Sequence, residues 1–401
     1  MIHTERHYIK ENEQILVLCQ QSKELYNRCN FLMRQAWINH QTLPDISKLI
    51  EETQSLDCFK NLHNTKTAKQ TIRKCLTDWT NFKKALNAYK KNSSKFLGIP
   101  KPPHYKNKLA QVVFYNETIK GGQSSKLEKQ KSGIITPSND CFSIKSNRKY
   151  KQVVITPKTF GFIIDVSYET SNIIPRKSKQ ESVVCIDLGV NNLCAITSDK
   201  HSPILINGRI VKSINQYYNT NPCKSRSKKR YFRMENYFHH VSKFIIDNCA
   251  NNKIGTIIIG KNDGWKQNTK KGKRMRKKNR QEFQYIPFGK LIEKIVYKAE
   301  MTGISVIFTE EAYTSQSSFL DRDILPDYET GKKTNPEFSG KRIKRGLYQS
   351  KEGILLNADC NGSANIGRKI IPNMNNEWDR SVAATPVIVN PLRSKKLSVY
   401  V

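Results

Sequence analysis

The chain has 401 residues, which is enough for two or three domains with substantial cores and no need for disulfide bonds or structural metals. It carries 69 Lys and Arg residues against 34 Asp and Glu residues, a formal net charge of +35. So large an excess repels itself unless a polyanion neutralises it, and solubility alone does not explain basic residues spread over several separate segments. The composition therefore favours nucleic acid as the partner, with a membrane surface as the alternative polyanion.

The sequence shows no signal for export or membrane insertion. The N-terminus, MIHTERHYIKENEQ, is polar, and the longest apolar runs, such as residues 257–259, are only strand-sized. Ten cysteines are scattered singly, without a Cys-x-x-Cys pair, which predicts reduced thiols. We expect a cytoplasmic protein that does not bind membranes.

The N-terminal half changes pattern once. Apolar residues recur with helical spacing from residue 11 to residue 89, which predicts a helical domain. A Pro-rich stretch at 92–105 ends it, and alternating segments such as KQVVITP and FGFIIDVSYE predict a small β-barrel or sandwich, with a polar loop at 121–133.

After a linker at 175–181, strands alternate with helices. VVCIDLGV, NLCAITS and SPILING predict three consecutive strands, followed by a helix, the strand TIIIG, a second helix and the strand ISVIFTE. The two helices are expected at residues 224–249 and 288–301. Residues 316–350 read as an exposed insertion, residues 361–371 as a short helix and residues 373–401 as a poorly ordered tail. The fold class is therefore α/β with a mixed sheet.

Acidic residues stand at the edges of this predicted sheet. Asp187 ends an apolar strand, Glu310 and Glu311 follow ISVIFT, and Asp359 precedes a helix. Phosphodiester hydrolysis suits such a group, because Mg²⁺ prefers oxygen ligands and one or two ions can activate water and stabilise the leaving oxygen. The structural alternatives are a turn or cap residue at Asp187 and a helix N-cap at Asp359.

Two motifs carry a resemblance to a known family. CIDLGVNNLCAIT (185–197) resembles the first RuvC motif of TnpB and the compact type V CRISPR nucleases, and NADCNGSANIGRK (357–369) resembles the third. Segments between them follow the order and spacing of the same family, so the resemblance covers residues 182–369, while the N-terminal half matches loosely. It implies an α/β, RNase H-like (RuvC) nuclease domain preceded by a helical recognition domain and a β-barrel wedge domain.

The resemblance also implies a domain plan. It gives residues 1–10 as the first strand of the wedge β-barrel, 11–95 as the recognition domain, 96–175 as the wedge, 176–315 and 351–372 as the nuclease domain, 316–350 as a target-nucleic-acid-binding insertion with a degenerate zinc ribbon, and 373–401 as a flexible tail.

By the same resemblance, the function is RNA-guided, Mg²⁺-dependent cleavage of DNA by a protein encoded in a transposable element. A guide RNA from the transposon end selects double-stranded target DNA, while the protein reads shape and a short flanking motif. The protein would act as a monomer or as a homodimer on its RNA.

The chain departs from the family at the second catalytic position. Many members carry a Glu directly after the strand corresponding to TIII, where this chain has Gly260. We expect a relocated Glu from the neighbouring strand, and because adjacent side chains of a strand point to opposite faces, only one of the pair should bind metal. The expected metal ligands are Asp187, Glu310 and Asp359, with Glu311 as the alternative.

The second departure concerns zinc. Family members often carry Cys-x-x-Cys pairs where this chain reads SQSSFLD and LYQSKEG, so no structural zinc is expected. The insertion is expected to be held instead by apolar packing of Phe319, Leu320, Phe338, Ile343, Leu347 and Tyr348.

Three basic segments are candidate nucleic-acid contacts, because two of them flank the predicted catalytic sheet, the third lies in the insertion, and together they could line a channel. They comprise Lys224, Arg226, Lys228, Lys229 and Arg230; Lys270, Lys271, Lys273, Arg274, Arg276, Lys277, Lys278 and Arg280; and Lys341, Arg342, Lys344 and Arg345. The alternative for the first is a solvated helix face, which the absence of interleaved acids disfavours.

Three other functions remain open. A nuclease-dead, RNA-guided repressor is favoured by Gly260 but not by the presence of both Asp187 and Asp359. A transposase should have a Tyr nucleophile with a His-hydrophobe-His metal pair, whereas His239 and His240 are adjacent on a predicted helix and cannot both face one ion. A Holliday-junction resolvase shares the fold but is a small dimer without such an N-terminal half.

Overall fold

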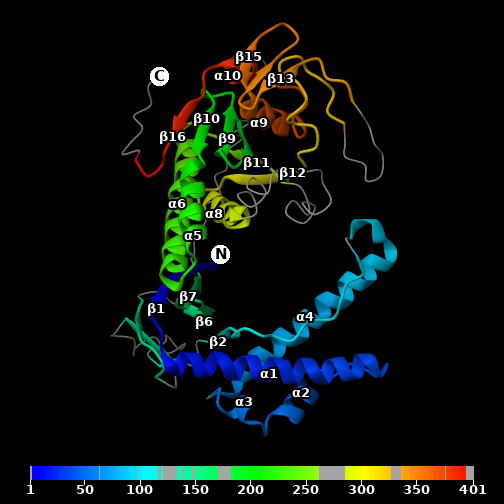
Figure 1. Ribbon diagram of the computed structural model, residues 1–401, viewed down its shortest axis with the longest axis vertical. Coiled ribbons are helices and arrows are strands. Elements are labelled where there is room, and N and C mark those ends of the chain that lie inside the picture. Colours follow the sequence, from blue (N-terminus) through cyan, green and yellow to red (C-terminus); the bar gives the residue numbers. More distant parts are fainter. Residues whose placement is uncertain are drawn as a thin grey trace. The chain divides into compact units, whose positions relative to one another are not determined.

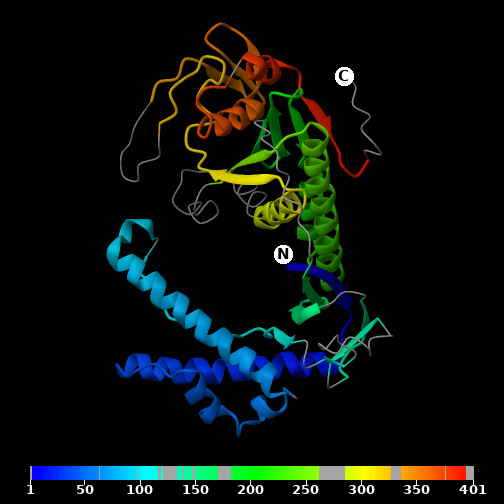
Figure 2. The same cartoon turned by 180° about the vertical axis from the view of Figure 1, so that it is seen from behind.

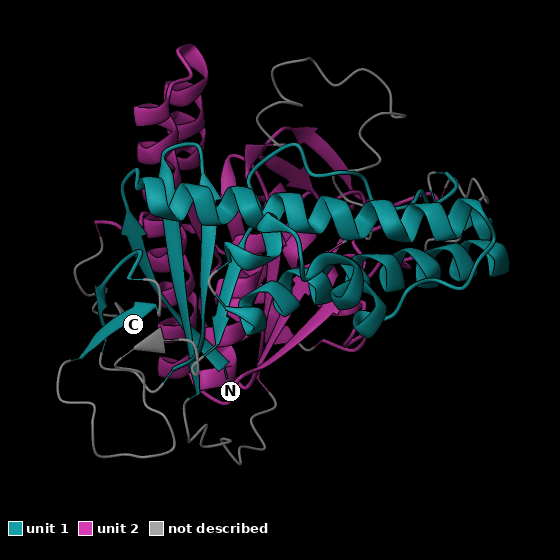
Figure 3. Ribbon diagram, turned by 90° about the horizontal axis from the view of Figure 1, so that it is seen from below, with its two compact units in different colours: residues 1–171 teal, residues 172–401 magenta. Residues whose placement is uncertain are grey.

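The computed structural model describes residues 2–62, 64–96, 98–115, 119–120, 133–137, 140–146, 150–169, 182–261, 285–326, 336–374 and 376–393. The chain forms two compact units, Met1–Ser171 and Asn172–Val401, which Figure 3 colours separately. The expected linker, most of the loop expected at 121–133 and the basic segment at 270–280 lie outside the described residues.

Unit 1 contains a group of helices that share one hydrophobic core with its strands. The helices are α1 (Glu13–Ile38), α2 (Ile46–Thr53), α3 (Asp57–Lys60) and α4 (Thr65–Lys91), followed by the 3₁₀ turn η1 (Ser93–Lys95) (Figure 1). Polar N-caps begin the long helices: the side chains of Asn12 and Asn64 accept backbone N–H groups of the first turns of α1 and α4. The buried indole of Trp79 donates to Asn30 Oδ1 at 2.8 Å and so ties α4 to α1.

Two small antiparallel sheets complete unit 1. One contains β1 (Ile2–Ile9), β2 (Val112–Tyr115), β6 (Tyr150–Lys158) and β7 (Gly161–Glu169) in the order β1-β7-β6-β2. The other contains β3 (Ile119–Lys120), β4 (Ile134–Pro137) and β5 (Ile144–Lys145). The N-terminal strand β1 pairs along its length with β7. Among the described strands no pairing joins β1 to β2, so the four-stranded sheet is open there rather than a closed barrel.

Unit 2 is built on a six-stranded mixed sheet. Its strands are β8 (Val183–Leu188), β9 (Asn192–Ser198), β10 (Ile204–Asn207), β11 (Thr256–Gly260), β12 (Ser305–Thr309) and β16 (Val387–Val389), in the order β12-β11-β8-β9-β10-β16. Strands β8, β9 and β10 form an antiparallel meander, and β11 and β12 extend it in parallel on the other side of β8. The sheet therefore matches the mixed α/β class predicted from the sequence.

Helices cover both faces of this sheet (Figures 1 and 2). On one face lie α5 (Arg209–Thr220), α6 (Lys224–Asn251) and α8 (Phe288–Met301), and on the other α9 (Ala358–Arg368) and α10 (Asn376–Ala383). Because side chains alternate along a strand, Val184 and Ile186 pack toward α6 and α8, whereas Val183 and Cys185 pack toward α9. The same alternation turns Asp187 toward α9.

The region after β12 forms a small sheet that leads into α9. Its strands are β13 (Lys341–Lys344), β14 (Leu347–Gln349) and β15 (Leu355–Asn357). Of the apolar residues expected to hold this insertion, Phe319 and Tyr348 are fully buried with α9 residues and Leu320 packs against the same cluster. Ile343 is 49% exposed, so it contributes little to this core.

Hydrogen bonds also link the two stretches SQSSFLD and LYQSKEG of the insertion. The carboxylate of Asp321 accepts the backbone N–H of Lys351 at 2.7 Å, and that of Asp323 accepts the N–H of Ser318 at 2.7 Å. Asp323 also accepts from Ser339. These carboxylates tie three parts of the insertion together through backbone and hydroxyl donors.

The prediction of a flexible tail at residues 373–401 is wrong for part of that range. Residues 376–383 form α10, in which Trp378 and Val382 are buried, and β16 pairs in parallel with β10. The physical reason is non-local, since three apolar residues at 387–389 become a strand only because the edge of β10 accepts them.

Candidate functional site

Asp187 and Gly260 lie at the carboxyl ends of two neighbouring parallel strands. The register pairs Ile186 of β8 with Ile259 of β11, which brings Asp187 level with Gly260. Both face α9: a Cβ atom at Gly362 of α9 would lie 3.1 Å from Asp187 Oδ2. Asp187 is therefore a strand residue aimed at a helix, not the turn or cap residue considered as its alternative.

Asp359 enters the same region from the first turn of α9. The N-cap of this helix is Asn357, whose Oδ1 accepts the backbone N–H groups of Asp359 and Cys360 at 3.0 and 3.2 Å. The alternative in which Asp359 is itself the N-cap is therefore wrong, and its carboxylate is available for other partners. Asp359 Oδ2 accepts from Asn192 Nδ2 at 2.7 Å, and Oδ1 accepts from Arg342 at 3.4 Å.

Glu311 fills the space beside Gly260. A Cβ atom at residue 260 would lie 2.7 Å from both Cγ and Oε1 of Glu311 and 2.6 Å from Cδ1 of Ile366. Real Cβ atoms do not approach neighbours so closely, so the Glu311 side chain and any side chain at position 260 exclude one another. A carboxylate from the turn after β12 thus stands where a side chain on β11 would otherwise project.

Glu310 has a different environment. Its carboxylate forms an ion pair with Lys369, at the end of α9, and its Oε2 also accepts the backbone N–H of Ala312 at 2.9 Å. The side chain of Lys369 is only 6% exposed, so its charge is taken out of water and depends on Glu310. The structure thus brings Glu311 to Asp187 and Gly260, and Glu310 to Lys369.

The electrostatics of the group show negative charge concentrated in one place. Burial, and then the negative charge of Asp359, raise the pKa of Asp187 to about 7, although Arg342 opposes the shift. Burial, and then the charge of Asp187, raise the pKa of Glu311 to about 8. Asp187 thus interacts with both other carboxylates, which links the three groups electrostatically.

These residues fit a divalent cation in kind. Within the described residues no three His, Cys, Asp or Glu side chains form a ready-made metal-binding group. The donors are nevertheless carboxylate oxygens, which hard cations such as Mg²⁺ prefer. A cation would offset both the burial and the repulsion that raise the pKa values of Asp187 and Glu311. Asp187, Glu311 and Asp359 are therefore the groups that could hold one.

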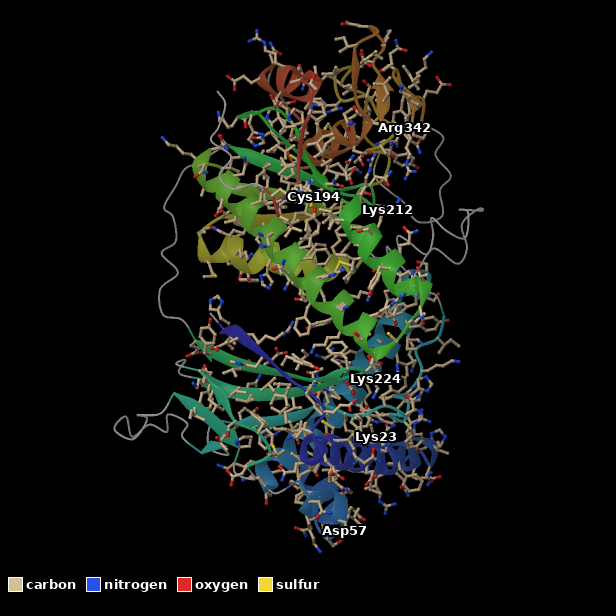
Figure 4. The ribbon with its side chains drawn as sticks, turned by 60° about the vertical axis from the view of Figure 1, so that its left-hand side comes forward. Lys23, Asp57, Cys194, Lys212, Lys224 and Arg342 are labelled. Carbon is tan, nitrogen blue, oxygen red and sulfur yellow. The ribbon has the colours of Figure 1, made fainter. Side chains whose placement is uncertain are left out.

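The candidate basic residues fall into separate places. Arg342, on the exposed strand β13, lies beside Asp359, whereas Lys224, in the first turn of α6, lies at the opposite end of unit 2 (Figure 4). Arg230 is engaged within the fold, because it donates to Asn215 and to the carbonyl of Tyr285 at 2.8 and 2.9 Å. The exposed candidates are Lys224, Lys229, Lys341, Arg342, Lys344 and Arg345.

Sequence reasoning did not single out several side chains that hold the carboxylates. Asn192 donates to Asp359, and Asn361 and Asn365 on α9 bind carbonyl groups of the turn after Glu311. The signal was present in the motif NADCNGSANIGRK, where two asparagines stand four residues apart on one helix face. Buried asparagines there call for polar partners, which only the fold reveals.

A family model matches the part of the chain that carries two of the three carboxylates. Residues 288–366 match the Cas12f1-like TNB domain. This TNB segment runs from α8 through β12 and the insertion to α9, and so includes Glu310, Glu311 and Asp359. Its only cysteine is Cys360, so it contains no cysteine cluster.

Solved structures of related size resemble the chain over most of its length. A cryo-EM structure of a Cas12f1–sgRNA–target DNA complex covers 91% of this chain and 98% of its own, with 16% identity and a TM-score of 0.34. A CRISPR-Cas12f ternary complex covers 88% and 81%, with 14% identity and a TM-score of 0.34. The mini-RNA-guided endonuclease CRISPR-Cas phi3 covers 92% of both chains, with 11% identity and a TM-score of 0.45. At such identities and TM-scores these likenesses do not bear on function.

No curated protein matches the chain. Within the described residues, no helix combines the length and the apolar character needed to cross a membrane.

Proposed function

We propose that this chain is an RNA-guided, metal-dependent DNA endonuclease of the TnpB and Cas12f-like group, encoded by a transposable element, that cuts target DNA next to a short flanking motif. The observation that carries the proposal is the meeting of Glu311 with Asp187 beside Gly260. It supplies a carboxylate at the position where this chain lacks the usual family Glu. Asp187, Glu311 and Asp359 then make a complete three-carboxylate group.

The fold and the matched segment support the same proposal. A central strand flanked by an antiparallel meander on one side and parallel strands on the other is consistent with an RNase H-like nuclease domain. The TNB segment belongs to a family model named after an RNA-guided nuclease. We assign the helical part of unit 1 to recognition of the guide–target hybrid and its sheets to the wedge.

Each residue has a distinct part in the proposed reaction. Asp187, Glu311 and Asp359 would hold Mg²⁺, which when bound supplies an activated water and charge stabilisation at the leaving oxygen. Asn192 orients Asp359 by its hydrogen bond at 2.7 Å. Arg342 balances part of the negative charge near Asp187 and Asp359, and its exposed position suits contact with a phosphate of the bound strand.

Nucleic acid is the partner that the net positive charge favours. With a net charge of +35, affinity for a nucleic-acid backbone should fall steeply as salt concentration rises. We propose a guide RNA as the stable partner and double-stranded DNA as the substrate, with the protein acting as a monomer or a homodimer on the RNA in the cytoplasm.

A nuclease-dead repressor is the second candidate, because Gly260 removes the usual Glu. Each raised pKa means that the ionised carboxylate disfavours the folded state. A protein that only binds DNA would gain nothing from carrying these carboxylates together. Their presence together in this chain supports catalysis over simple binding.

The test is cleavage of a plasmid library that carries the guide-matched target beside randomised flanking bases. The protein is purified with its co-expressed flanking RNA and assayed with Mg²⁺ or EDTA as wild type, Asp187→Ala and Asp359→Ala. We expect guide-dependent cutting that needs Mg²⁺ and is lost in both variants. Target binding without cutting by the wild type would instead support the repressor.

A further inference from the structure

Three polar side chains on α9 lie along one edge of the turn that carries Glu311. Asn361, Asn365 and Lys369 are spaced four residues apart, and Lys369, directly after the helix, still has helical backbone angles. Residues with this spacing share one helix face. Both asparagines are fully buried, and the Lys369 side chain is nearly so.

Each of the three binds the segment that follows β12. Asn361 Nδ2 donates to the carbonyl of Ser317 at 2.8 Å, and Asn361 Oδ1 accepts the N–H of Phe319 at 3.0 Å. Asn365 Nδ2 donates to the carbonyls of Thr314 and Ser317 at 3.0 and 2.7 Å. Lys369 pairs with Glu310 at the start of the segment. The segment from residue 310 to residue 319 is therefore fixed to α9 at three successive levels.

The turn between these anchors has an unusual backbone. Tyr313 has φ of 63°, in the left-handed region that side-chain-bearing residues avoid. The turn closes on Glu311, whose carbonyl accepts the hydroxyl of Thr314 at 2.9 Å. Such a conformation persists only where its surroundings hold it, and here the holding contacts include two hydrogen bonds from Asn365.

We propose that Asn361, Asn365 and Lys369 are positioning residues that hold the turn so that Glu311, rather than Glu310, faces Asp187. This inference rests on the proposed function and adds to it how a relocated carboxylate is kept in place. Lys369 determines which of the two adjacent carboxylates is used: its ion pair holds Glu310 away from Asp187 and leaves Glu311 to face Asp187. The two asparagines then fix the distance between the turn and the helix that carries Asp359.

The variants that test this are Asn365→Asp and Lys369→Met. The first keeps the volume of residue 365 but removes both donors, and the second removes the partner of Glu310. Each guide-loaded protein is assayed for the Mg²⁺ concentration that gives half-maximal cleavage and, without target DNA, for the Mg²⁺ concentration that gives half of the Mg²⁺-dependent rise in melting temperature. Removing groups that orient metal ligands should raise both concentrations about tenfold or more, while cleavage recovers at saturating Mg²⁺. Lys369→Arg, which keeps the ion pair, should restore the wild-type midpoints.

Asn30→Asp is the matched control for burying an acid. Asn30 is also fully buried and makes two side-chain hydrogen bonds, but it lies in unit 1. It should lower the melting temperature without moving either Mg²⁺ midpoint. If Asn365→Asp and Lys369→Met only lower stability or maximal rate and leave both midpoints unchanged, the positioning role is wrong. A wild-type protein that does not cut would instead defeat the proposed function itself.

Discussion

The two faces of the unit 2 sheet are both buried, but they do different work. The face under α6 and α8 is filled by aliphatic and aromatic side chains such as Ile186, Phe238 and Ile295, all fully buried. The face under α9 is packed closely by small residues, with Gly362 against Asp187 and Gly367 against Cys185, and ends in carboxylates. The face under α6 and α8 therefore stabilises the sheet, whereas the face under α9 holds acidic side chains close together at a cost in stability.

The largest effect on cleavage is expected on the face under α9, from removing Glu311 and then from placing a carboxylate on β11 instead. Glu311→Ala should lower Mg²⁺-dependent cleavage at least about a thousandfold, as loss of a group acting as part of a unit does. The double variant Gly260→Glu with Glu311→Ala should regain part of this, because removing Glu311 relieves one of the two close contacts at position 260 and the other is only the flexible side-chain end of Ile366. The measurement is the single-turnover cleavage rate. Equal inactivity of both variants would show that the two positions are not interchangeable.

On the opposite face, Ile186→Ala should affect stability alone. Truncating a fully buried aliphatic side chain costs about 2–5 kcal/mol, because contacts are lost and a cavity remains. Denaturant unfolding measures this cost, and the Mg²⁺ concentration for half-maximal cleavage should stay at the wild-type value. A shifted Mg²⁺ midpoint would mean that the two faces are coupled more tightly than their packing indicates.

The ion pairs of Glu235 between α6 and α8 predict acid sensitivity. Burial alone would raise the pKa of Glu235, but hydrogen bonds and charge from Lys290 and Lys294 outweigh it and hold the pKa at about 2. The stabilisation is present above the ordinary value of 4.5 and is lost as pH falls toward 2. It amounts to about 3 kcal/mol, so Glu235→Gln should lower stability by that order at pH 7 and by little at pH 2. Denaturant unfolding measured from pH 2 to pH 7 should show the unfolding free energies of the wild type and Glu235→Gln converging as the pH falls.

The smallest expected effect has the opposite sign. The pKa of Asp187 is raised from 3.8 to about 7, so its ionisation opposes folding increasingly as pH rises through this range. The rise corresponds to about 4 kcal/mol at pH 8, from which the cost of burying the Asn amide, about 1–3 kcal/mol, is subtracted. Asp187→Asn should therefore stabilise the metal-free protein at pH 8 by roughly 1–3 kcal/mol, with no gain below pH 4. The measurement is the melting temperature of the wild type and of Asp187→Asn, both in EDTA, at pH 8 and at pH 4. A loss of stability at pH 8 would show that the carboxylate is held by contacts that favour its charge.

Much of the sheet and its helices could be predicted from local patterns. The helix predicted at residues 288–301 has those bounds, and the helix predicted from residue 224 ends two residues later than expected, at Asn251. The helix predicted from residue 361, α9, begins at Ala358, because Asn357 caps it and brings Asp359 into its first turn. Periodicity gives the elements, while a cap contact sets the boundary.

The choice between Glu310 and Glu311 could not be made from the sequence. The two residues are neighbours with the same chemistry, and the expected ligand set named Glu310 first. Residues distant in the sequence distinguish the two: Lys369 pairs with Glu310, and Gly260 leaves space for Glu311. We therefore propose Glu311 as the ligand and Glu310 as the anchor.

The most direct test of this account compares Glu311→Gln with Glu310→Gln in the same guide-loaded cleavage assay. Each variant removes one negative charge and keeps the side-chain volume. We predict that Glu311→Gln abolishes cutting at every Mg²⁺ concentration, whereas Glu310→Gln still cuts when Mg²⁺ is saturating. The reverse result, with Glu311→Gln active and Glu310→Gln inactive, would contradict the central claim that Glu311 replaces the carboxylate missing at Gly260.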